Sequence, residues 1–126
     1  MIDGFHPLGF VLINRIDETW LPEGLSAVEC GTYLLPQYRG RGFNVSVKQA
    51  LCTRALEQFQ ADWAMFVVPN SNVRAKRAMN KLPWSIDVVT HDRSGLFARY
   101  LHRKSWETGQ PSEMYAFPLP LRPTDF

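Results

Sequence analysis

The sequence predicts an α/β fold with an α+β mixed sheet, one that contains both parallel and antiparallel strands. Short apolar runs rich in β-branched and aromatic residues, bounded by turn residues, indicate the strands. Two stretches with apolar residues at helical spacing lie between these runs. The chain has 126 residues, 45% of them hydrophobic, which is enough for one buried core. We therefore expect one domain over residues 1–119 and an extended, proline-containing tail over residues 120–126.

The individual elements follow from the same pattern. A helix is expected over residues 43–60, because Leu51, Ala55 and Phe59 fall on one helical face. A second amphipathic helix carries Met79 and stops before Pro83. Strands are expected over residues 7–15, with a buried apolar run at 8–13, and over residues 25–35, 63–68, 86–90, 96–102 and 114–119.

Composition and charge limit the classes of function. Fourteen basic and twelve acidic residues leave a net charge of +2, so general attraction to polyanions is weak. The longest apolar run, residues 63–68, is far shorter than the roughly 20 residues that span a bilayer. No basic and apolar leader opens the sequence, so a cytoplasmic protein is expected. Cys30 and Cys52 are expected to be buried thiols, and the histidines lack metal-ligand spacing, so no metal site is predicted.

Residues 37–42, Gln-Tyr-Arg-Gly-Arg-Gly, carry the clearest chemical signal. They follow a predicted strand and precede a predicted helix, whose first N–H groups and positive dipole end favour an anion. The glycines allow the backbone to approach a ligand closely, and Arg39 and Arg41 add charge-assisted contacts to a pyrophosphate. The loop lacks the Lys-Ser/Thr end of a P-loop and the third glycine of a dinucleotide fingerprint.

Several segments in order resemble the GNAT N-acetyltransferase superfamily. Residues 28–43, VECGTYLLPQYRGRGF, closely resemble its acetyl-CoA motif and are most similar to the ribosomal-protein N-acetyltransferase (Rim-like) branch. Segments before and after this motif also resemble family strands and the second cofactor helix, so that the resemblance covers about residues 7–119. It implies the acyl-CoA N-acyltransferase fold without its first strand and first two helices.

The resemblance implies an acetyl-CoA site between the second and third predicted strands, which diverge in the family. The backbone of Leu34 and Leu35 is then expected to meet the pantetheine and the thioester, and the amides of residues 38–44 the pyrophosphate. Asn72 is expected to contact the pantetheine amides, and Arg77 either reaches the cofactor or belongs to a solvated helix face. The implied cofactor-binding residues are Leu34, Leu35, Gln37, Tyr38, Arg39, Gly40, Arg41, Gly42, Phe43, Asn44, Asn72 and Arg77.

The resemblance also bears on proton transfer. Glu29 is the candidate general base, because the Rim-like branch carries a carboxylate on the strand before the cofactor loop. A primary amine with a pKa near 10 must lose a proton before it attacks a thioester. The competing interpretation is a structural carboxylate paired with an arginine. The family's general acid has no counterpart, since Met79 and Ala75 stand where relatives carry tyrosine or serine, which leaves water to protonate the thiolate.

The elements that form the family's acceptor wall have no counterpart in this sequence. Three explanations stay open: a dimer partner supplies the wall, the chain is part of a longer one, or the site is open. A sheet without its first strand exposes an edge and apolar surface, which predicts a homodimer. The expected function is an acetyl-CoA-dependent N-acyltransferase (EC 2.3.1 type) that acetylates a protein N-terminal amine or a small amine in a ternary complex.

Two other functions compete with this one. A CoA-binding or assembly module that has lost turnover also explains the missing acid and the missing wall. A nucleic-acid binder would use a basic helix at residues 74–81 and a basic strand at residues 99–104, but no aromatic-interleaved RNA-binding motif accompanies them. Neither a nucleic-acid nor a membrane partner is therefore expected. Trp63, Trp84 and Trp106 are expected to pack in the core.

Overall fold

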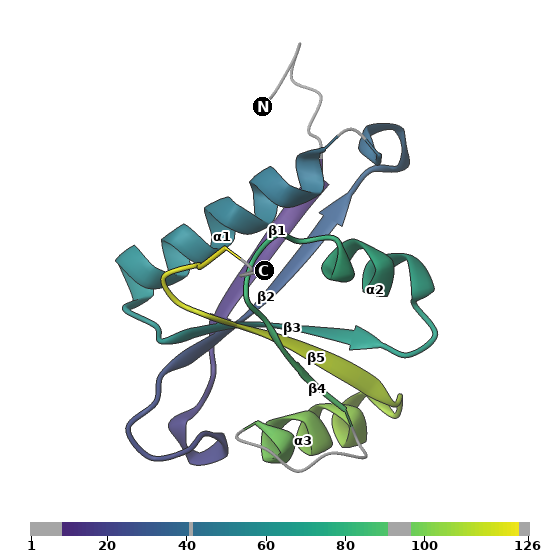
Figure 1. The fold of residues 1–126 in the computed structure, drawn as a ribbon. Helices are drawn as coiled ribbons and strands as arrows, with labels where there is room; N and C mark the ends of the chain where they lie inside the picture. The colour runs from purple at the N-terminus through teal and green to yellow at the C-terminus, as the bar shows by residue number, and fades with distance from the viewer. Residues whose placement is uncertain (1–8, 41, 91–96, 124–126) are drawn as a thin grey trace.

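The computed structural model describes residues 9–40, 42–90 and 97–123 (Figure 1). Its sheet has the order β1-β2-β3-β5-β4, in which β2 and β3 are parallel and the other neighbours are antiparallel. The predicted mixed sheet is therefore confirmed. The elements are β1 (Gly9–Arg15), the 3-10 turn η1 (Glu18–Trp20), β2 (Ala27–Leu34), the 3-10 turn η2 (Pro36–Tyr38), α1 (Phe43–Phe59), β3 (Trp63–Pro69), α2 (Val73–Asn80), β4 (Asp87–Val89), α3 (Ala98–Thr108) and β5 (Ser112–Pro118).

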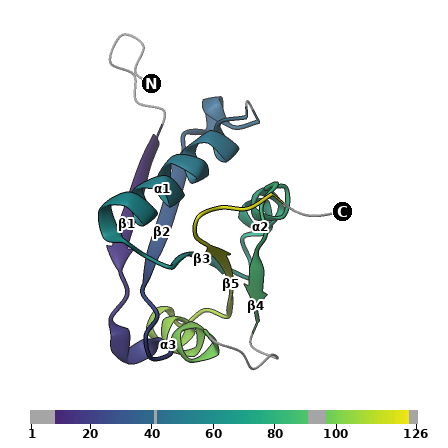
Figure 2. The same ribbon diagram turned by 60° about the vertical axis from the view of Figure 1, so that its left-hand side comes forward.

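Helices cover both faces of the sheet. On one face, α1 and α2 bury Leu51 and Met79 against a cluster that includes Phe66 of β3. On the other face, α3 buries Leu101 in a second cluster that includes Met65, the neighbour of Phe66 in β3. Figure 2 shows α3 well apart from α1 and α2. Among the helices described, none is both long and apolar enough to cross a membrane.

Helix α3 replaces the strand that was predicted over residues 96–102, of which residue 96 lies outside the described part of the chain. The helix buries Tyr100 and Leu101, and Phe97 at its N-cap is fully buried as well. These three positions have the i, i+3, i+4 spacing of one helical face. The strand prediction was wrong because it gave the β-prone composition of this short segment more weight than its periodicity.

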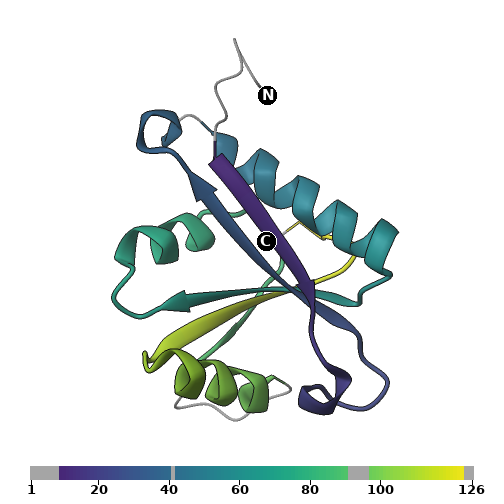
Figure 3. The ribbon, with the colours of Figure 1, turned by 180° about the vertical axis from the view of Figure 1, so that it is seen from behind.

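Strand β1 forms an exposed edge of the sheet (Figure 3). Residues 7 and 8 of the predicted strand lie outside the described part of the chain. Phe10, Val11 and Leu12 are 61%, 49% and 57% exposed, so the prediction of a buried apolar run was wrong for these residues. Within the described residues, β1 has β2 as its only strand neighbour, and Ile13 packs against the core under α1. An apolar strand is buried only when other elements cover it. The exposure of β1 agrees with the other prediction, that the sheet has an exposed edge with apolar surface.

The cysteines and tryptophans that were expected in the core differ in how far they are buried. Cys30 and Cys52 are buried and free, as predicted. Trp84 is buried and Trp63 is half-buried, with its ring edge-on to a neighbouring phenylalanine. Trp106 is 84% exposed on α3, so its predicted place in the core was wrong. It lies on the outer face of a helix that the sequence interpretation did not include.

The described part of the tail follows the core closely. Leu119 and Leu121 pack against the cluster under α1 and α2. The Leu119 N–H donates to the Asp62 carbonyl at 2.9 Å, and Pro123 forms an isolated bridge with Trp84. Leu119, at the end of the predicted domain, and Leu121, in the predicted tail, therefore both contribute to the hydrophobic core. Residues 124–126 lie outside the described part of the chain.

Candidate cofactor site between strands β2 and β3

Strands β2 and β3 pair only at their N-terminal ends. Their parallel ladder joins residues 27–29 to residues 63–65, and Glu29 and Met65 form its last pair. Beyond this pair, β2 continues alongside β1 and β3 continues alongside β5, so that the two strands diverge (Figures 1 and 3). We call the region beyond Glu29 and Met65, where the two strand backbones are no longer paired, the opening. Within the described part of the chain, no third strand pairs with the edges that face it, so an extended ligand can hydrogen-bond to them as an added strand does.

The loop between β2 and α1 begins where β2 ends beside the opening. Gly40 and Gly42 have φ of +76° and +82°, a left-handed conformation that favours glycine. Gly42 is also the N-cap of α1 and provides no side-chain cap, so the first N–H groups of this 17-residue helix are available to a ligand. Arg41 lies outside the described residues. A glycine loop before a free helix N-terminus is suited to a phosphate group.

Contacts within the loop hold it against the end of β2. The Arg39 Nε donates to the Leu34 carbonyl at 3.0 Å, and its guanidinium lies over the Tyr33 ring, 5.3 Å from the centroid. The Tyr38 N–H donates to the Leu35 carbonyl at 2.9 Å. The backbone of Leu34 and Leu35 was expected to meet the pantetheine and the thioester, and the two carbonyl groups of this backbone accept hydrogen bonds from the loop.

The other implied cofactor residues lie on η2, α1 and α2. Gln37 is exposed and Phe43 is half-buried. Asn72 caps α2, because its Oδ1 accepts a hydrogen bond from the Ala75 N–H at 3.2 Å. Arg77 is exposed on α2. The structure therefore brings the loop, the start of α1 and the C-terminal end of β2 together, while Arg77 faces solvent.

A buried lysine lies on the α1 side of the opening. Lys48 is only 5% exposed. Its Nζ donates to Thr32 Oγ1 at 3.0 Å and to Asn44 Oδ1 at 2.5 Å, and it lies 5.5 Å from the centroid of the Phe66 ring. Thr32 of β2 and Phe66 of β3 both follow the last pair of the ladder. The ammonium group of Lys48 therefore bridges the two strands where they diverge.

The burial of Lys48 makes the stability of the fold depend on pH. Burial lowers the pKa of Lys48 from 10.5 to about 8. Between these values the unfolded chain binds more protons than the folded one, so the free energy of unfolding rises with pH. We expect a gain of up to about 3 kcal/mol from pH 7 to pH 10.5, and its absence in Lys48→Met. Urea unfolding at several pH values measures it, and an equal pH dependence in both proteins would contradict the assignment.

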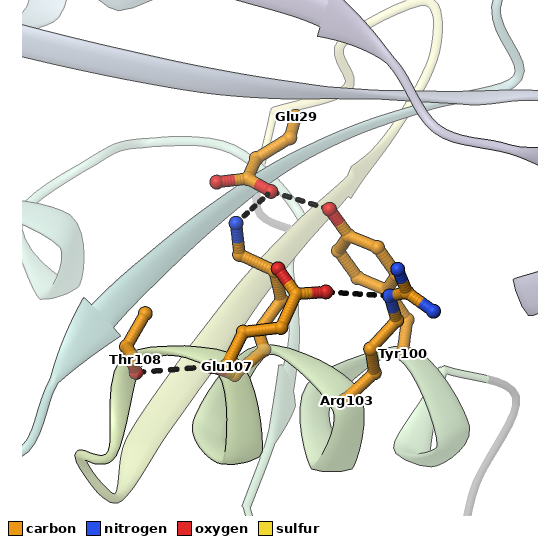
Figure 4. A network of polar contacts seen from close by, with 6 residues as sticks. Glu29, Tyr100, Arg103, Glu107 and Thr108 are labelled. Carbon is orange, nitrogen blue, oxygen red and sulfur yellow. Dashed lines mark hydrogen bonds and ion pairs between the residues drawn. The ribbon is translucent and has the colours of Figure 1, made fainter.

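Glu29 lies at the vertex of the opening, on the opposite face of the sheet. The Tyr100 hydroxyl donates to its Oε1 at 2.5 Å (Figure 4), and Lys104 Nζ forms an ion pair with the same oxygen at 3.2 Å. Oε2 has no hydrogen-bond partner within the described part of the chain, and the side chain is 26% exposed. One carboxylate oxygen is thus held while the other can accept a proton. The ion-pair partner is a lysine, where the structural interpretation had expected an arginine.

Helix α3 carries Tyr100 and Lys104, the two partners of Glu29, and also has basic residues that pack against η1. Burial, followed by the hydrogen bond to Glu29, raises the pKa of Tyr100 far above its ordinary value, so this phenol stays a donor. Arg99 and Arg103 place their guanidinium groups 4.8 and 4.3 Å from the centroid of the Trp20 ring. The basic segment at residues 99–104 is therefore a helix that packs against η1, and the prediction of a basic strand was wrong.

The described part of the chain also has surface hollows away from the opening. Within residues 9–40, 42–90 and 97–123, no group of three or more His, Cys, Asp or Glu side chains could hold a metal ion. Two surface hollows, of about 510 and 380 Å³, lie along α3 with the turn after it and along residues 18–26. Neither hollow borders the opening. The opening combines strand edges without a strand partner, a glycine loop and two ionisable side chains, Glu29 and Lys48.

No protein-family model and no curated protein matches this sequence, whereas solved structures share its fold. A chimera of spermidine N-acetyltransferase SpeG from Vibrio cholerae and hSSAT has a TM-score of 0.60 at 13% identity, covering 94% of this chain and 63% of that one. A GNAT-family acetyltransferase from Bacillus anthracis has a TM-score of 0.57 at 13% identity, with coverages of 88% and 58%. The Vibrio cholerae spermidine N-acetyltransferase in complex with CoA and spermine has a TM-score of 0.56 at 13% identity, with coverages of 88% and 57%.

The chain has the GNAT fold. The predicted fold class is confirmed by this likeness, which extends over most of the described elements. This chain covers less than two thirds of the length of each of these GNAT structures. Within the GNAT fold, β2, β3 and α1 are the elements on which the sequence motif had located the acetyl-CoA site.

Proposed function

We propose that this chain binds acetyl-CoA in the opening and transfers the acetyl group to a primary amine in a ternary complex. The observation that carries the proposal is the divergence of β2 and β3 beyond Glu29 and Met65, with a carboxylate at the vertex and a glycine loop at the far end. Free strand edges suit an extended amide-containing arm, and a free helix N-terminus suits a diphosphate. Both chemical features belong to acetyl-CoA.

The residues around the opening supply the chemistry that acyl transfer requires. Oε2 of Glu29 takes the proton from the attacking amine, directly or through water, while Tyr100 and Lys104 hold Oε1. Peptide N–H groups on the free edge of β2 donate to the thioester oxygen, where negative charge develops. The new N–C bond forms, the C–S bond breaks, and the thiolate leaves with the bonding electron pair.

For the acceptor, we infer a protein N-terminal amine or a small amine. The Rim-like motif at residues 28–43 supports the first class. One structural neighbour was solved with CoA and spermine, which supports the second. A thiol-release assay with acetyl-CoA and a panel of N-terminal peptides, spermine and amino sugars tests both. Amine-dependent thiol release supports the proposal, and the panel then identifies the acceptor class.

A second candidate is a CoA-binding module without turnover. The observation that favours it is the ion pair between Lys104 and Glu29, since a paired carboxylate can be purely structural. Met79, where relatives carry a hydroxyl group, is buried in the apolar core. Binding of acetyl-CoA without thiol release for any amine in the panel would favour this module over the enzyme.

We also propose that the chain forms a homodimer through β1. The exposed Phe10 and Leu12 lie beside the unpaired edge of this strand, and Phe10 stacks on Tyr33 of β2 at a centroid distance of 5.3 Å. Exposed apolar edge strands favour pairing with another chain. We expect light scattering at micromolar concentration to give a dimer for the wild type and a monomer for Leu12→Lys. A monomeric wild type would refute this assembly.

A further inference from the structure

Two groups that can carry a proton flank the opening from opposite faces of the sheet. Glu29 belongs to the last β2–β3 pair and turns toward α3, where Tyr100 holds it. Lys48 reaches the opening from α1 and contacts Thr32 and Phe66, which lie just past that pair. A reaction centre in the opening would therefore lie between a carboxylate on one side and an ammonium group on the other.

We infer that Lys48 is the general acid of the proposed reaction and gives a proton from Nζ to the leaving thiolate. The inference rests on the proposed function and deepens it, because neither the sequence motif nor the fold assigns a proton donor. As the C–S bond breaks, its electron pair passes to sulfur, which takes the proton from Nζ. Lys48 is left as a neutral amine and regains a proton from water, and the resulting hydroxide takes the proton that Glu29 accepted from the amine, so atoms and charges balance.

The contacts of Lys48 fit this role. Thr32 Oγ1 and Asn44 Oδ1 accept two of the three ammonium hydrogens, which fixes Nζ and leaves one hydrogen for a further acceptor. Asn44 donates in turn to the Ala78 carbonyl at 3.2 Å, so the same network joins α1 to α2 across the end of the opening. Among the described residues, Lys48 is the charged side chain buried against the opening on this face.

The lowered pKa of Lys48 suits a group that gives a proton to a thiolate. Burial lowers the pKa of Lys48 to about 8, close to the value of about 8.5 for an ordinary thiol. An acid of this strength is protonated at neutral pH and can still release its proton to a thiolate.

Burial is the main cause of the lowered pKa of Lys48, and the nearby Cys52 acts in the opposite direction. On α1, the Cys52 thiol is the titratable group that interacts electrostatically with Lys48, and burial raises the pKa of this thiol to about 12. On β2, burial raises the pKa of the Cys30 thiol to about 12 as well. The nearest groups on β3 and α2 carry no charge, since they are the ring of Phe66 and the Ala78 carbonyl. Arg15 of β1 donates to the Phe59 carbonyl, at the other end of α1 from Lys48. Both thiols are thus neutral over the pH range in which Lys48 titrates.

The test compares Lys48→Arg and Lys48→Met with the wild type and with Lys81→Met, a control at an exposed lysine at the end of α2. Arginine keeps the positive charge but retains its proton at working pH, and methionine keeps the length without charge. Calorimetry measures acetyl-CoA affinity, thermal melting measures folding, and thiol release with the identified amine gives kcat from pH 6 to 10.

We expect wild-type kcat to fall above about pH 8, as Lys48 loses its proton. Both Lys48 variants should bind acetyl-CoA nearly as the wild type does, lose about 10²-fold or more in kcat, and lack this alkaline limb. Unchanged kcat and pH profile in the variants would overturn the inference while the proposed function stands. If the variants do not fold, a wild-type profile without a limb near pH 8 overturns it. A wild type that shows no turnover overturns both proposals.

Discussion

Glu29→Gln is expected to lower kcat for acetyl transfer by about 10²- to 10⁴-fold. Glutamine has the shape of glutamate and can still accept the Tyr100 hydrogen bond, but it cannot take a proton from the amine. Because Glu29 lies at the vertex of the opening and not at the loop, acetyl-CoA affinity should change by no more than about threefold. Thiol-release kinetics at saturating amine, together with calorimetry, separate the two effects.

Glu107→Gln is the matched control for this substitution. Glu107 also lies on the α3 side of the protein, where its Oε1 pairs with Arg103 Nε at 2.5 Å, but it is exposed and does not touch Glu29 (Figure 4). The control removes the same charge and should leave kcat unchanged. If Glu29→Gln and Glu107→Gln were equally active, Glu29 would be a structural carboxylate and the proposed base would be wrong.

Phe117→Ala is expected to cost about 3–5 kcal/mol of unfolding free energy. Phe117 is fully buried in β5, and its ring meets Phe66 and Trp84 edge-on at centroid distances of 5.9 and 6.1 Å. Its removal leaves a cavity between β3 and the segment before β4, which these rings join. A loss of this size is a large share of the roughly 5–15 kcal/mol by which domains are stable, so urea should unfold the variant at a much lower concentration.

Trp106→Ala provides the comparison for this core substitution. Trp106 is a larger aromatic residue but is 84% exposed on α3, so its removal should change the unfolding free energy by no more than about 0.5 kcal/mol. A loss at Trp106 equal to that at Phe117 would show that this tryptophan is covered in solution. A loss below about 1 kcal/mol at Phe117 would contradict the described core.

Local patterns predicted the part of the fold that surrounds the site. The helical face of Leu51 and Ala55 and the strand-like runs that became β2 and β3 are local patterns, and their predicted bounds fall within a few residues of those observed. The glycine loop is equally local, because the positive φ at Gly40 and Gly42 favours glycine. These features depend on neighbours in the sequence, so the sequence was sufficient to find them.

The features that were missed depend on contacts between distant residues. Tyr100 and Glu29 are 71 positions apart, and their contact exists only because residues 98–108 form a helix across the sheet from α1. Exposure of β1 likewise depends on whether another element covers it. Lys48 is a different case, because its place three and four residues before Leu51 and Cys52 puts it on the buried face of α1. A lysine in that position was a signal that the sequence interpretation did not use.

Calorimetric titration with acetyl-CoA tests most directly whether the opening is a cofactor site. The folded wild type should bind one acetyl-CoA per chain with micromolar affinity. Arg41→Glu, which reverses a charge in the glycine loop, should abolish binding, whereas Arg54→Glu on an exposed part of α1 makes the same charge change and should not. Absence of binding to the folded wild type, or equal binding by both variants, would contradict an acetyl-CoA site at this loop.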